Sequence, residues 1–77
     1  MKKLALGEFG TWQQIEANVA AQGYVLRLDR GADPALYAQF CVERDEDHGA
    51  LEVYGWDANL QSGTRVAVVD TNNVFLK

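Results

Sequence analysis

Hydrophobic residues recur at every second position over residues 36–43 and 50–56, and aromatic residues occupy positions between them. Every second side chain of a strand points to the same face, so the pattern predicts two strands that carry apolar groups on both faces. The side predicted to face the core carries Leu36, Ala38, Phe40, Val42, Leu51 and Val53. The opposite side carries Tyr37, Gln39, Cys41, Glu52, Tyr54 and Trp56.

A single amphipathic helix is predicted earlier in the chain, over Trp12–Gln22, where hydrophobic residues fall at spacings of three and four. Thr11 is the predicted N-cap, and Gln14 three residues later completes a capping-box pattern. Gly23 is expected just beyond the helix end, because the left-handed conformation that closes many helices costs glycine nothing extra.

The remaining segments predict further strands and turns. With the two strands above, the predicted strands are 2–6, 24–30, 36–43, 50–56, 64–69 and 74–76. For 35–40, one helical turn after Pro34 is the alternative, and the β-favouring residues of this segment favour the strand. Consecutive strands joined by short turns predict an antiparallel meander.

One helix can cover only one face of a sheet, and this decides the predicted fold class. We expect an α+β fold in two layers, with one short helix packed on one face of a mostly antiparallel sheet of four to five strands. The predicted core consists of Trp12, Ile15, Val19, Leu26, Leu28, Phe40, Val42, Leu51, Val53, Val66 and Val68.

The composition is that of one small globular domain, residues 1–77, with 48% hydrophobic residues. A chain of this size buries only about 60% of the surface that its unfolded form exposes, so a partner chain is one way to complete its core. No stretch is long and apolar enough to span a membrane. The apolar part of Met1–Leu6 is shorter than that of a signal peptide, so we expect a complete, soluble, cytoplasmic protein.

The net charge of −4 and the scattered positions of the basic residues argue against direct binding to nucleic acid. The carboxylates cluster in the predicted hairpin tip around residues 45–49. They are Glu43, Asp45, Glu46 and Asp47, which we call the acidic hairpin. The segment lacks the further oxygen ligands of a calcium loop, so we expect a solvated tip that protects the sheet from edge pairing. The alternative is an inhibitor that mimics nucleic-acid phosphates.

The sequence contains no specific catalytic motif. Ser62 lacks the two flanking glycines of a nucleophile elbow, and His48 lies in a polar turn without a suitable nucleophile. Cys41 is the only cysteine and is expected to be a small buried apolar residue. We therefore expect a non-enzymatic protein with no metal site and no cofactor.

The second sheet face is the predicted interaction surface. Its predicted members are Tyr37, Cys41, Tyr54, Trp56 and Val69. Aromatic residues are enriched in interface cores and hot spots, which favours an interface here. The alternative is a monomer in which long polar neighbours cover these rings. We expect a protein-binding module that contacts another protein or a second copy of itself, such as an adaptor, inhibitor or accessory factor of bacteria or their mobile elements. The alternatives are a small-ligand binding module and a minimal enzyme assembled at a dimer interface.

Overall fold

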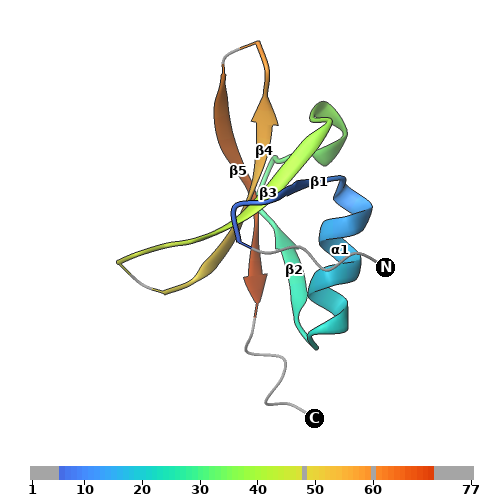
Figure 1. Ribbon diagram of the computed structural model, residues 1–77, viewed down its shortest axis with the longest axis vertical. Helices are drawn as coiled ribbons and strands as arrows, with labels where there is room; N and C mark the ends of the chain where they lie inside the picture. The colour runs from blue at the N-terminus through green and yellow to red at the C-terminus, as the bar shows by residue number, and fades with distance from the viewer. Residues whose placement is uncertain (1–5, 48, 60, 71–77) are drawn as a thin grey trace.

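The computed structural model describes residues 6–47, 49–59 and 61–70. Along the chain the elements are β1 (Phe9–Gly10), α1 (Trp12–Ala21), β2 (Val25–Leu28), the 3-10 turn η1 (Pro34–Leu36), β3 (Gln39–Arg44), β4 (Leu51–Asp57) and β5 (Ser62–Asp70). The strands form one five-stranded antiparallel sheet in the order β1-β3-β4-β5-β2, and α1 packs on one of its faces (Figure 1). The predicted two-layer α+β fold is confirmed.

Local interactions at its two ends define α1. The Thr11 hydroxyl accepts a hydrogen bond from the Gln14 amide at 3.2 Å, and the Gln14 side chain accepts one from the Thr11 amide at 2.8 Å. The predicted capping box is therefore confirmed. Beyond the helix, Gly23 has a φ of +84°, the left-handed conformation predicted for this position.

The strand order corrects the predicted meander, which holds only for β3, β4 and β5. β2 pairs with β5 at one edge of the sheet, and β1 pairs with β3 at the other. The ten residues of α1 are about 15 Å long, while the outer strands of a five-stranded sheet lie about 19 Å apart. Because α1 crosses the sheet between β1 and β2, these strands reach opposite edges and β3 to β5 fill the space between them.

The start of the strand predicted over 36–43 is also corrected. Pro34 opens a single 3-10 turn that ends at Leu36, and the Asp33 carboxylate caps it by accepting a hydrogen bond from the Ala35 amide at 3.0 Å. The helical alternative for this segment was therefore right for its first residues. Strands were also predicted at the two ends of the chain, over 2–6 and 74–76. Residues 2–5 of the first and all of the second lie outside the described residues.

A β-bulge changes which residues of β5 face the core. Val53 pairs with Ala67 whereas its neighbour Tyr54 pairs with Arg65, so Val66 is an extra residue in β5. The register shift reverses the predicted alternation beyond the bulge. The predicted core residue Val68 consequently lies in register with Glu52 on the face opposite α1.

The core lies between α1 and the sheet. Its buried residues are Ile15, Val19, Phe40, Val42, Val53, Val66, Ala67 and Val69. Trp12, Leu26 and Leu51, all predicted for the core, are partly buried against this cluster. Leu28 was predicted for the core but is 49% exposed, because it lies at the end of the edge strand β2.

Candidate functional site

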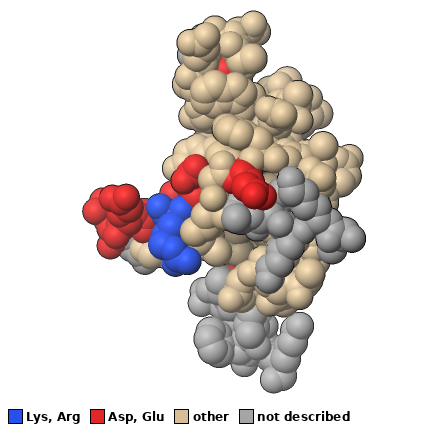
Figure 2. Space-filling model, in the orientation of Figure 1, with Lys and Arg blue, Asp and Glu red and all other residues tan. Residues whose placement is uncertain are grey.

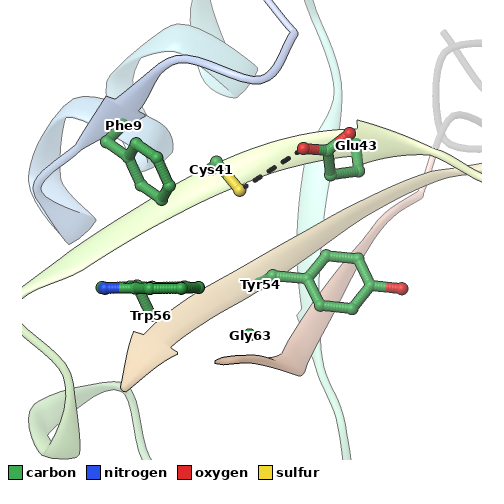
Figure 3. Close-up of a pocket in the computed structure, with 6 residues that line it drawn as sticks. All are labelled: Phe9, Cys41, Glu43, Tyr54, Trp56 and Gly63. Carbon is green, nitrogen blue, oxygen red and sulfur yellow. Dashed lines mark hydrogen bonds between the residues drawn. The ribbon is translucent and has the colours of Figure 1, made fainter. Parts of the chain in front are cut away.

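The sheet face opposite α1 contains a hollow of about 380 Å³. We call it the open-face hollow, and it is lined by Phe9, Cys41, Glu43, Tyr54, Trp56 and Gly63 (Figure 3). Strands β1, β3, β4 and β5 each contribute to it. Cys41 pairs with Phe9 on one side and with Tyr54 on the other, so these three side chains stand in one row across the sheet.

Aromatic rings form one end of the open-face hollow. The rings of Phe9 and Trp56 meet edge to face, with their centroids 6.0 Å apart. Phe9 is 49% exposed and Trp56 is half-buried, so this end is accessible from solvent. Gly63 of β5 pairs with Trp56, and because it has no side chain it leaves space beside Tyr54, the nearest side chain to its position.

Cys41 lies between the rings and Glu43 (Figure 3). Cys41 is only 7% exposed, and its thiol donates a hydrogen bond to Oε1 of Glu43, with 3.7 Å between the sulfur and the oxygen. Burial raises the pKa of the Cys41 thiol, and the negative charge and hydrogen bond of Glu43 raise it further. The thiol therefore stays protonated at neutral pH, which suits a weakly polar contact surface and opposes nucleophilic chemistry.

An ion-pair network borders the open-face hollow beyond Tyr54. Arg65 bridges two carboxylates, with Nε 2.7 Å from Asp29 and Nη1 2.8 Å from Glu52. The Tyr54 hydroxyl donates to Glu52 at 3.2 Å. Burial raises the pKa of Tyr54 most, and Glu52 raises it further. The hydrogen bond to Glu52 holds the Tyr54 hydroxyl in place, and both carboxylates share the one guanidinium.

The structure brings three of the five predicted interface residues together, namely Cys41, Tyr54 and Trp56. Tyr37 was placed on the wrong face. It precedes β3, outside the alternating pattern, and its ring lies 6.1 Å from that of Phe40 and partly buried against the core. Val69 was also misplaced, since the bulge in β5 turns it toward α1, where it is 7% exposed.

Two residues of the open-face hollow, Phe9 and Gly63, were not predicted. Phe9 lies outside the strands predicted from the sequence, and the pairing of β1 with β3 joins segments about thirty residues apart. Nothing in the local sequence signals such a contact. Gly63 lacks a side chain, so its contribution becomes visible only when its strand partner Trp56 is known.

The acidic hairpin projects from the body of the molecule, with its acidic tip beside a basic residue (Figures 1 and 2). The tip is a tight turn, in which the Asp45 carboxylate accepts a hydrogen bond from the Asp47 amide at 2.9 Å. Arg44 donates to the Gly49 carbonyl at 3.1 Å across the turn. Glu46 and Asp47 are exposed there, whereas Glu43 belongs to the open-face hollow. His48 lies outside the described residues.

Comparison with protein-family models, with curated proteins and with solved structures finds no match. Within residues 6–47, 49–59 and 61–70, no three His, Cys, Asp or Glu side chains gather in a way that would hold a metal ion. Of the helices in this part of the chain, none has the length and apolar character needed to cross a bilayer.

Proposed function

We propose that this chain is a non-enzymatic protein-binding module that holds a side chain of its partner in the open-face hollow. One observation carries the proposal: three aromatic side chains and a protonated thiol line a hollow on the sheet face that α1 leaves uncovered. Aromatic residues in a concave setting are the usual anchors of protein interfaces. The accessible rings favour binding, and the protonated thiol opposes nucleophilic chemistry.

The partner is proposed to be a different protein and not a second copy. Each copy has a net charge of −4, and a face-to-face pair would bring two such charges together. A partner of opposite charge gains from the same field in its rate of association. If light scattering coupled to size exclusion shows that the purified chain is a dimer, the proposal that the partner is a different protein is contradicted.

Substitution of Gly63 tests the proposal without disturbing the core. A Cβ at Gly63 would lie 3.6 Å from the Cβ of Tyr54, an ordinary contact, so a side chain can begin there, and Gly63→Leu is expected to extend into the hollow. Thr64→Leu is the matched control, because the next residue of a strand points to the other face. Thr64 is exposed, so this variant adds the same apolar side chain away from the hollow.

The experiment uses the immobilised full chain to capture proteins from extracts of its source cells. Captured proteins are purified, and their affinities for the wild type and both variants are measured by calorimetry. We expect Gly63→Leu to weaken binding at least about tenfold, as loss of a hot-spot contact does, and Thr64→Leu to change it little. Equal affinity of the wild type and Gly63→Leu, or the absence of any protein that binds the purified chain, would overturn the proposal.

A further inference from the structure

The end of the open-face hollow opposite the rings is formed by Glu43, whose charge is not balanced within the described chain. Glu43 lies directly opposite Glu52 in the register of β3 and β4, and facing like charges destabilise a strand pair. Glu52 forms an ion pair with Arg65 at 2.8 Å, although Arg65 also pairs with Asp29 at 2.7 Å. In residues 6–47, 49–59 and 61–70, no Lys or Arg forms an ion pair with Glu43, which accepts a hydrogen bond from the Cys41 thiol.

The two ends of the open-face hollow are close enough for one short segment to touch both. Figure 3 shows the rings of Phe9 and Trp56 at one end, Glu43 at the other, and the Cys41 thiol between them. Oε1 of Glu43 lies 3.7 Å from the Cys41 sulfur, which forms the middle of the floor. An aromatic side chain placed over the sulfur makes a favourable contact there and leaves the carboxylate within reach of the neighbouring residue.

We infer that the partner segment carries an aromatic side chain next to a lysine or arginine, whose cation pairs with Glu43. The inference rests on the proposed function and adds the chemistry of the partner. Glu46 and Asp47, exposed at the tip beyond Glu43, extend the negative charge along the approach of such a segment. Charge complementarity of this kind sets specificity and association rate more than total affinity.

Three capped dipeptides test the inference: the N-acetyl amides of phenylalanyl-lysine, phenylalanyl-glutamine and phenylalanyl-glutamate. Each is titrated into the full-length, nitrogen-15-labelled protein at low ionic strength, and the indole N–H signals are followed by NMR. Trp56 reports on the open-face hollow. Trp12, whose ring packs on Phe40 with centroids 5.1 Å apart, serves as the internal reference on the other face.

The lysine dipeptide is expected to bind about two- to fivefold more tightly than the glutamine dipeptide, a difference in the range of an exposed ion pair. The glutamate dipeptide should bind most weakly. Glu43→Gln should abolish these differences, and Glu43→Lys should reverse their order. Glu46→Gln is the matched control, because it removes the same charge from the exposed tip and should preserve the order.

Two results would overturn the inference and leave the proposed function standing. One is equal binding of the three dipeptides to the wild type. The other is the same preference for lysine in Glu43→Gln as in the wild type. If none of the dipeptides shifts the Trp56 signal, the aromatic anchor itself is absent, and the proposed function fails together with the inference.

Discussion

At Gly55, in the middle of β4, the packing leaves no room for a side chain. A Cβ built at Gly55 would lie 2.6 Å from Cγ and from Cδ2 of the Tyr37 ring. Carbon atoms in contact are about 3.5 Å apart or more, so the Cβ and the ring would overlap by about 1 Å. The ring cannot withdraw freely, since it also packs edge to face on Phe40.

Gly55→Ala is therefore expected to destabilise the fold. Forcing an extra carbon into a packed site costs about 1–3 kcal/mol. In a domain of this size each kcal/mol lowers the midpoint of thermal unfolding by about 4–8 °C. The assay is thermal unfolding followed by circular dichroism, with urea unfolding at 25 °C as a second measure of the free energy of unfolding.

The Tyr37→Ala background should reverse the sign of the effect. With the ring removed, the Gly55 site is open, and its φ is not positive, so alanine fits the strand without strain. Alanine then stabilises by about 0.5–1 kcal/mol relative to glycine, because the unfolded chain is less flexible. The double-mutant cycle isolates the contact between ring and backbone.

Gly63→Ala is the matched control in the neighbouring strand. Its Cβ would make only an ordinary contact with Tyr54, so this variant should be neutral or slightly stabilising. Gly55→Ala as stable as the wild type would refute the reasoning. An equal loss of stability in the wild-type and Tyr37→Ala backgrounds would refute it as well, because the cost would then not arise from the ring.

Three further predictions concern the helix cap, the bulge and the thiol. Thr11→Ala removes the capping hydrogen bond and should lower the free energy of unfolding in urea by about 1 kcal/mol; no loss would contradict the role of the cap. Val69→Thr buries a hydroxyl in the core and should cost about 1–3 kcal/mol, whereas Val68→Thr on the other face should stay within about 0.5 kcal/mol; the opposite order would contradict the bulge. The raised pKa of Cys41 leaves less thiolate at pH 8.5, so iodoacetamide should alkylate the folded wild type more slowly than Glu43→Gln, and equal rates would exclude Glu43 as a cause.

The sequence predicted the elements that depend on neighbours close along the chain. The capping box around Thr11 and Gln14, the glycine after α1 and the acidic turn between β3 and β4 were all expected, because their hydrogen bonds join residues within about five positions. The alternation in β3 and β4 also placed Cys41, Tyr54 and Trp56 on one face, since the side-chain period of a strand is two. This part of the open-face hollow could be predicted.

The errors occurred where the period of two is interrupted. Tyr37 directly follows a 3-10 turn at a place where β-favouring residues favoured a strand over the helical alternative, and its ring packs against the core. Val69 lies beyond a bulge, where one extra residue in β5 exchanges the two faces. A bulge is a property of two paired strands, and the sequence of one strand does not specify it.

The sequence by itself determined the helix and its ends, the acidic turn, most of the strands and hence the two-layer class, because these follow from side-chain periodicity and short-range hydrogen bonds. Only the tertiary structure decided that β1 lies beside β3, that β2 reaches the opposite edge, and that β5 changes register. Each of these depends on contacts between residues far apart in the chain, whose energies no local pattern records. The open-face hollow exists because Phe9, Glu43 and Gly63 arrive at one place from three different strands.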